Sequence, residues 1–171
     1  MSGLYGVGVS ASDVTTALQN AAAAPKLIRA SKTFTGAANL GAVGVNELFT
    51  TTGAVVIDGF WVHCTDDLVD AVDGAFFEIG VTGTPSLWTG GAFLTPFDLD
   101  TIDAGDGINT DLGTAVDGYS YSGAFVVVIF DNIIMTISAQ AITGGTLEFY
   151  ILYRPLSSDG ALTLGAGMTQ I

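Results

Sequence analysis

The residues of this chain that could carry chemistry are one histidine, one cysteine, a few serines and two groups of aspartates. His63 and Cys64 are adjacent, which suggests a thiol–imidazole pair. On a strand, however, adjacent side chains point to opposite faces, so these two cannot hydrogen-bond to each other. In the pattern Phe60, Val62, Cys64 the thiol falls on an apolar face, whereas Trp61 and His63 share the other face. We therefore predict a buried, unreactive thiol at Cys64 and a surface or interface position for His63.

Other catalytic and cofactor motifs are missing from the sequence. No serine has the Gly-x-Ser-x-Gly setting of a nucleophile elbow, and residues 118–122 come closest but lack the final glycine. The sequence contains no phosphate-binding loop of the Gly-x-x-x-x-Gly-Lys form, and Gly6 and Gly8 precede no strand–helix unit of dinucleotide-binding type. A single histidine cannot build a His-based metal site within one chain. We therefore expect no catalytic residues, no cofactor and no metal, and predict that the protein is not an enzyme.

Two groups of aspartates could supply the oxygen ligands that Ca²⁺ requires. They are Asp66, Asp67, Asp70 and Asp73, and then Asp98, Asp100, Asp103 and Asp106. Neither group matches an EF-hand loop, since Ile102 stands at the fifth position of the second group, where an oxygen ligand is expected. Solvated acidic loops are the interpretation that we favour. Paired carboxylates for glycoside hydrolysis, with Trp61 and Trp88 stacking on sugar, are an alternative that spacing in the sequence cannot test.

The whole chain is acidic and poor in charged residues. Of its 171 residues 49% are hydrophobic and 12% are charged, and the formal net charge is −13. Such a field repels DNA, RNA and anionic lipid, so we expect no nucleic-acid partner and no membrane partner. Three of the four cations, Lys26, Arg29 and Lys32, lie in residues 25–33, which form the only positive patch. The single cysteine excludes an internal disulfide, and the absence of an 18-residue apolar run and of a signal-peptide pattern predicts a soluble protein.

The elements that must position these residues are almost all strands. Residues 142–160 give the clearest signal, because Leu147, Phe149, Ile151 and Tyr153 alternate onto one apolar face. Asp131-Asn132 between two apolar runs predicts a tight hairpin, and the irregular residues 95–121 predict a surface excursion. Many short strands without intervening helices indicate an all-β, jelly-roll-like antiparallel β-sandwich. We place its strands near residues 33–37, 45–51, 54–65, 74–82, 91–97, 123–130, 132–139 and 145–154.

The N-terminal segment has a different character. Residues 1–9 are rich in glycine, and Ser10 to Asp13 have the form of a capping box. Helical spacing of apolar residues follows, until Pro25 ends the helix near Ala24. We therefore divide the chain into an N-terminal arm with one short helix, residues 1–32, and a β-sandwich domain, residues 33–171. A frayed terminus is the alternative to a functional arm.

Three stretches resemble small virion proteins of tailed bacteriophages. Residues 131–160, with ITGGTLEFY and RPLSSDG, are similar to the end of those proteins. Residues 98–105 (DLDTIDAG) resemble their middle, and residues 32–45 resemble the opening of their β region. The resemblance implies a capsid decoration, or cement, protein of jelly-roll type that trimerises on the outer surface of an icosahedral shell. The implied partners are the major capsid protein and further copies of the chain.

Under this hypothesis a threefold cluster buries apolar surface between subunits, and the arm binds the neighbouring capsomer. The expected arm contacts are Leu4, Tyr5, Val14, Leu18, Lys26, Arg29 and Lys32. The alternative is a tail or receptor-binding module, in which Trp88, Tyr119 and Tyr121 stack on host glycans. A hydrolase that uses Asp98, Asp100 and Asp103 ranks last.

Overall fold

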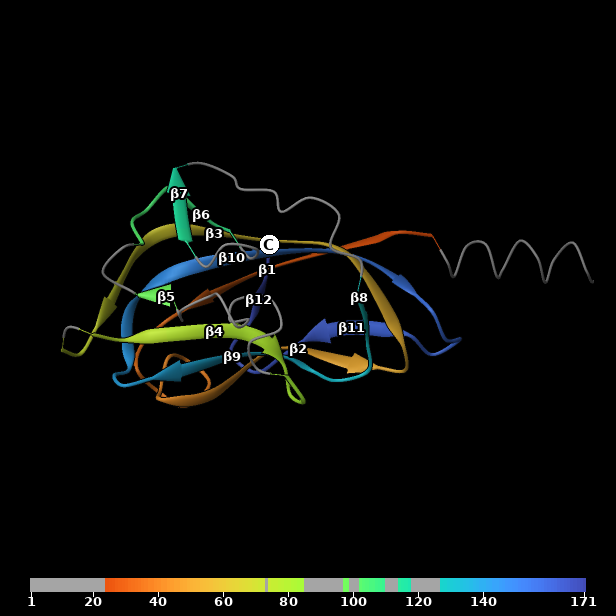
Figure 1. The fold of residues 1–171 in the computed structure, drawn as a ribbon, viewed down its shortest axis with the longest axis horizontal. Coiled ribbons are helices and arrows are strands. Elements are labelled where there is room, and N and C mark those ends of the chain that lie inside the picture. The colour runs from red at the N-terminus through yellow and green to blue at the C-terminus, as the bar shows by residue number, and fades with distance from the viewer. Residues whose placement is uncertain (1–23, 73, 85–96, 99–101, 110–113, 118–126) are drawn as a thin grey trace, which may run out of the picture.

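The computed structural model describes residues 24–72, 74–84, 97–98, 102–109, 114–117 and 127–171, and their regular structure is entirely β (Figure 1). The strands are β1 (Lys26–Thr33), β2 (Gly44–Thr52), β3 (Val55–Asp70), β4 (Phe76–Val81), β5 (Phe97–Asp98), β6 (Asp106–Asn109), β7 (Thr114–Asp117), β8 (Val127–Ile129), β9 (Ile133–Ser138), β10 (Ile142–Pro155), β11 (Ala161–Leu164) and β12 (Thr169–Gln170).

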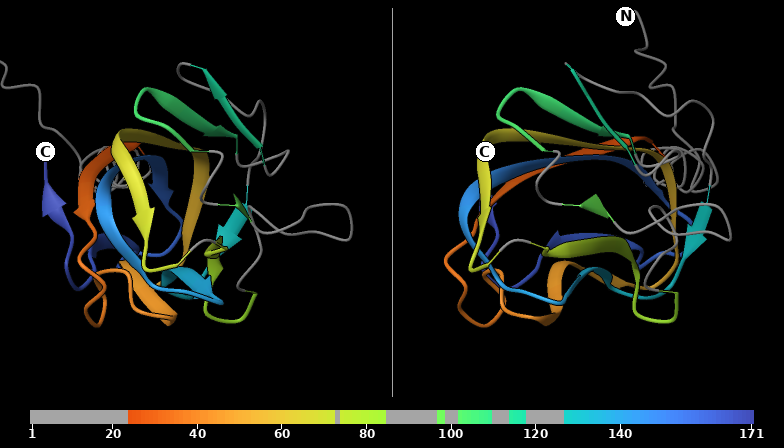
Figure 2. Two further views of the ribbon diagram at one scale, coloured as in Figure 1. Left: turned by 90° about the vertical axis from the view of Figure 1, so that its left-hand side faces the viewer. Right: turned by 60° about the vertical axis from the view of Figure 1, so that its left-hand side comes forward.

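These strands form two antiparallel sheets that face each other as a sandwich (Figure 2). The larger sheet has the order β12-β1-β10-β3-β6-β7, and β8 also pairs with β3. The smaller sheet has the order β11-β2-β9-β4-β5. The all-β sandwich that the alternating pattern predicted is therefore confirmed, whereas the order of the strands could not be read from the sequence.

The long strand β10 lies at the centre of the larger sheet. Its Phe149 pairs with Ala30 of β1 on one side and with Val62 of β3 on the other. The four residues predicted to share its apolar face, Leu147, Phe149, Ile151 and Tyr153, are all buried, so this prediction is confirmed. Near its start the strand bulges at Gly145, where a side chain would collide with the carbonyl oxygen of Asp67.

Aromatic contacts join the two sheets in the core. The ring of Phe149 meets Phe49 of β2 edge to face, with 6.4 Å between ring centroids and an interplanar angle of 79°. Phe60 of β3 stacks on the same ring at 6.4 Å. Because Phe149 contacts a residue of the facing sheet and a residue of its own sheet, it lies where the two layers are packed together.

Two predictions about connections are corrected. Residues 26–32, which we placed in the arm, belong to β1 and pair with β10 along their whole length. Asp131-Asn132 is not the turn of a hairpin, because β8 before it pairs with β3 of the larger sheet and β9 after it pairs with β2 and β4 of the smaller one. The chain crosses between the layers there.

Other predictions were incomplete or are untested. Within the predicted excursion at 95–121, β6 and β7 form a hairpin that continues the larger sheet. The strands β11 and β12 were not predicted, because each is short and follows glycine-rich turns. The helix expected over residues 10–24 lies outside the described residues except for Ala24.

None of the described segments is a helix long enough and apolar enough to cross a bilayer.

The position of Phe149 leads to a prediction about stability. Replacing Phe149 with alanine removes a fully buried ring from the packing between the sheets, so the free energy of unfolding should fall by about 3–5 kcal/mol. Denaturant unfolding measures this change. The matched control is Leu27→Ala, which truncates an exposed side chain of β1 and should change stability by less than about 1 kcal/mol. Equal losses in the two variants would contradict the central role of Phe149.

Candidate interaction surface

The residues expected to contact a partner fall into two sets. Leu4, Tyr5, Val14 and Leu18 lie outside the described residues, as do Trp88, Tyr119 and Tyr121 of the glycan-binding alternative. The three expected cations, in contrast, all lie on β1. Lys26 and Arg29 are exposed, whereas Lys32 is fully buried.

Lys32 points into the sandwich and ties three segments together. Its Nζ donates a hydrogen bond of 3.1 Å to the carbonyl oxygen of Glu47 on β2 and another of 3.1 Å to that of Ala166, after β11. Burial lowers the pKa of Lys32 to about 8, and the negative charge of Glu47 opposes this shift. The expectation that Lys32 is a surface anchor is therefore corrected: its ammonium group is used inside the protomer.

Arg29 lies on the outer face of the larger sheet, in one row with Tyr150 and Trp61. Its guanidinium carbon lies 5.3 Å from the centroid of the Tyr150 ring, within the range of a cation–π contact. The hydroxyl of Tyr150 hydrogen-bonds to the carboxylate of Glu148. These contacts hold the arginine side chain along the sheet while leaving it exposed to a partner.

The fourth cation is neutralised within the sheet. Arg154 donates to both carboxylate oxygens of Asp58, with distances of 2.6 and 2.7 Å. This hydrogen bonding lowers the pKa of Asp58 and raises that of Arg154. Over the described part of the chain this is the only ion pair. Lys26 and Arg29 are exposed and form no ion pair with another described residue.

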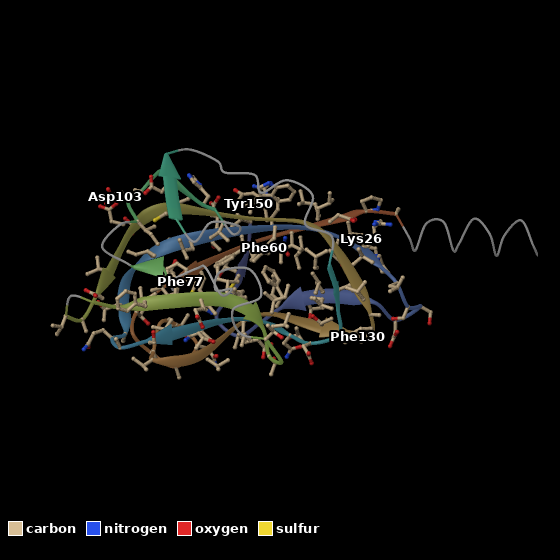
Figure 3. The ribbon with its side chains drawn as sticks, in the orientation of Figure 1. Lys26, Phe60, Phe77, Asp103, Phe130 and Tyr150 are labelled. Atoms are coloured by element: carbon tan, nitrogen blue, oxygen red, sulfur yellow. The ribbon has the colours of Figure 1, made fainter. Side chains whose placement is uncertain are left out.

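Exposed apolar side chains gather near the start of β1. We call this surface the apolar end; it consists of Leu27, Val128, Phe130 and Leu156. The register places them at the same end of the larger sheet, with β10 and β3 between Leu27 and Val128, because β1 begins beside Tyr153 of β10, Val128 pairs with Val56, and Val56 pairs with Arg154. Figure 3 shows Lys26 and Phe130 at this end of the sandwich. Large exposed apolar groups in a cluster are typical of surfaces that bind other proteins.

Little in the sequence pointed to the apolar end. Phe130 ends the apolar run FVVVIF of a predicted strand, and such a run favours burial, yet its side chain is 69% exposed. Leu156 follows Pro155 directly and Leu27 belongs to the segment placed in the arm. A usable signal was that Phe130 directly precedes the turn predicted at Asp131-Asn132 and that Leu156 directly follows Pro155, since a sheet covers apolar side chains less well where its strands end.

Carboxylates gather at the opposite end of the larger sheet. Several of them accept hydrogen bonds from backbone N–H groups: Asp67 from Ala104 at 2.6 Å, and Asp70 from Ala75 at 2.9 Å. Asp106 accepts one from Asp103 at 3.0 Å. Among the described residues, no three His, Cys, Asp or Glu side chains form a group that could hold a metal ion. Asp67, Asp70 and Asp106 therefore order the backbone around them, whereas Asp73 and Asp100 lie outside the described residues.

Cys64 and His63 point to opposite faces, as predicted. Cys64 pairs in register with the buried Leu147, whereas His63 pairs with Glu148 on the outer face. The thiol is fully buried and donates to the carbonyl oxygen of Asp66 at 3.2 Å. Burial raises the pKa of the Cys64 thiol to about 11, so the nucleophilic thiolate is disfavoured at neutral pH.

Comparison with known proteins gives a distant match to a solved structure. No protein-family model matches this chain, and no curated protein sequence is similar to it. One chain of a solved structure described as "Cyanophage Pam1 capsid asymmetric unit" is similar over 75% of this chain and 83% of that one, with 14% sequence identity and a TM-score of 0.42. A TM-score this low does not establish a common fold.

The buried lysine predicts a particular pH dependence. Between pH 8 and 10.5 the native protein has lost the Lys32 proton while the unfolded chain still holds it, so unfolding takes up a proton. The free energy of unfolding should therefore rise with pH across this window, by up to about 1.4 kcal/mol per pH unit from this group. The measurement is the difference in stability between the natural protein and Lys32→Met at each pH. Other titrating groups, such as Cys64, cancel in that difference. Parallel stability curves for the two proteins would contradict the prediction.

Proposed function

We propose that this chain is a non-enzymatic structural protein of a tailed-bacteriophage virion, a decoration or cement protein on the outer surface of the capsid. Its partners would be the major capsid protein and further copies of itself, as a homotrimer. Bound across the seam between neighbouring capsomers, it would stabilise the shell against outward pressure. The likeness of residues 131–160, 98–105 and 32–45 to phage virion proteins motivates the proposal.

The order of the strands in the two sheets is the strongest support for a capsid protein. In the larger sheet β1, β10, β3 and β6 lie side by side, and in the smaller sheet β2, β9, β4 and β5 do so. The chain passes from β1 in one sheet to β2 in the other, back to β3 and over to β4, and its late strands β9 and β10 insert between these early ones. This order supports a jelly roll, an architecture that many viral capsid proteins use.

Fold alone does not establish function, so the surface must also suit the role. Phe130 and Leu156, 69% and 60% exposed, would gain by burial against a partner. The one cysteine is buried and lies on the opposite face from the one histidine, which argues against the two acting as a catalytic pair. Both features favour a binding protein over an enzyme.

The proposal is tested with shells assembled without this protein from the major capsid protein of the same genome. Purified protein should bind them to a fixed, saturating number of copies, and decorated shells should break at a higher temperature than bare ones. Light scattering of heated shells and quantitative gel densitometry measure the two effects. Absence of saturable binding, together with a positive signal on a glycan array, would favour the receptor-binding alternative instead.

Variants locate the contact with the shell. Phe130→Ser should weaken shell binding by about tenfold or more, because burying such a side chain contributes about 1.5–3 kcal/mol. The matched control is Val45→Ser, which changes an exposed side chain on the smaller sheet and should leave binding unchanged. Deleting residues 1–24 tests the arm in the same assay, and undiminished occupancy would remove the arm from the mechanism.

A further inference from the structure

The outer edge of β1 is only partly covered. On one side β1 pairs with β10 along all eight of its residues. On the other side its described neighbour is β12, which is two residues long and pairs only with Ala30 and Ser31 (Figure 2). Ile171, after β12, reaches the carbonyl oxygen of Arg29. Residues 26–28 therefore have no described strand beside them on that side.

The backbone of Leu27 presents hydrogen-bonding groups to this open edge. On the β10 side the N–H of Phe34 donates to Gly145, whereas on the β12 side the carbonyl oxygen of Arg29 accepts from Nε2 of Gln170 at 3.0 Å. In an antiparallel sheet a residue directs its N–H and C=O to the same side, and that side alternates along the strand. The odd-numbered residues of β1 thus face away from β10. The N–H and C=O of Leu27 point to a position where no described strand lies.

The hydrophobic core is also incompletely covered along this edge. Ala30, beside β12, is fully buried, whereas Ile28, two positions earlier on the same face, packs against the core but is only partly buried. The other partly buried described side chains that pack against the core are Leu164, the last residue of β11, and Met168, just before β12. All three lie at the side of the sandwich where β11 and β12 are the outer strands. A further strand beside Leu27 would cover more of Ile28.

Hydrogen bonds fix the position of β12 along β1. Nζ of Lys32 donates to the carbonyl oxygen of Ala166 at 3.1 Å, and the N–H of Gly165 donates to the carbonyl oxygen of Leu48 at 2.9 Å. Both bonds hold the connection between β11 and β12. They keep β12 beside the second half of β1 and leave the first half open.

The side chains along the edge indicate what kind of strand fits. Lys26 and Arg29 are exposed and form no ion pair with a described residue, and Leu27 between them is 58% exposed. Two copies paired through this edge would bring these cations together, and charged side chains commonly protect edge strands against such self-pairing. A strand that carries carboxylates would instead gain by lying beside Lys26 and Arg29.

We propose that β1 binds an extended, acidic segment of another protein, which adds to the larger sheet as a new edge strand beside residues 26–28. The backbone of this segment pairs with the N–H and C=O of Leu27, as in other cases of strand addition. Two apolar side chains cover Leu27 and Ile28, and a carboxylate on each side of them lies near Lys26 or Arg29. Glu-Val-Val-Glu is the simplest sequence with this pattern. The inference does not depend on the proposed function, because the segment need not belong to a capsid protein.

Synthetic peptides test the inference with no shell present. The probe is Thr-Glu-Val-Val-Glu-Thr with blocked ends, and Thr-Lys-Val-Val-Lys-Thr is its control. Titration of the isotopically labelled protein, followed by NMR, should give saturable shifts at β1 and a dissociation constant at least tenfold lower for the glutamate peptide. The amide hydrogen of Leu27 should exchange rapidly in the free protein and at least tenfold more slowly with saturating probe. The amide of Ala30, which faces β10, should exchange slowly in both states.

Variants separate backbone pairing from side-chain contact. Leu27→Pro removes the N–H that faces the edge and leaves the ladder with β10 intact, and edge strands tolerate proline at such positions. It should raise the dissociation constant of the probe by about tenfold or more and keep the thermal midpoint close to that of the natural protein. The matched control, Leu27→Ala, shortens the same side chain but keeps the N–H, so it should weaken binding less. Lys26→Glu, which leaves the backbone unchanged, should shift the preference toward the lysine peptide.

Four results would each overturn the inference. They are a lack of saturable binding, equal affinity for the two peptides, a Leu27 amide that is already protected in the free protein, and undiminished binding to Leu27→Pro. Loss of shell binding alone would reject the proposed function and leave the strand-addition edge standing, since no capsid protein takes part in the peptide experiment.

Discussion

The burial of one face of β10 against the smaller sheet is the interaction on which the rest of the structure depends. Phe149 contacts Phe49 across the layers and Phe60 within its own sheet. The same strand forms ladders with both β1 and β3, so the position of each outer-face residue is set by the register of β10. Arg29, Tyr150 and Trp61 form a row because Ala30, Phe149 and Val62 are paired beside them along the same three strands. The packing of the buried face of β10 therefore determines which residues are neighbours on the outer face of the larger sheet.

Patterns with a period of two were read correctly from the sequence in β10 and in the middle of β3, where one face of the strand is buried. The alternation in residues 147–153 and the opposite orientations of His63 and Cys64 both follow from local geometry. Strand pairing is different, because it joins residues far apart in the chain. The turn at Asp131-Asn132 was locally compatible with a hairpin, and only the pairing of β9 with β2 and β4 decides that the chain changes sheets there.

The environments of the charged side chains were the hardest feature to predict from the sequence. Lys26, Arg29 and Lys32 form one basic cluster in the sequence, yet the structure gives them different environments. Because side chains alternate along β1, Lys32 points inward and Arg29 points outward. The buried ammonium group of Lys32 is hydrogen-bonded to the carbonyl groups of Glu47 and Ala166. Those acceptors are set by distant segments that no local pattern predicts. The exposure of Phe130 and Leu156 could not be predicted either, because apolar composition alone predicts burial.

The bond between Lys32 and Ala166 spans 134 residues of sequence. During synthesis β1 leaves the ribosome early, but its buried lysine acquires this acceptor only when the last strands have emerged, and β12 then pairs beside it. A sheet that joins its first and last strands has high contact order and forms slowly. Completion of β1 is thus a late event in folding, and the surface that carries the cations of this strand forms only after β11 and β12 have been synthesised.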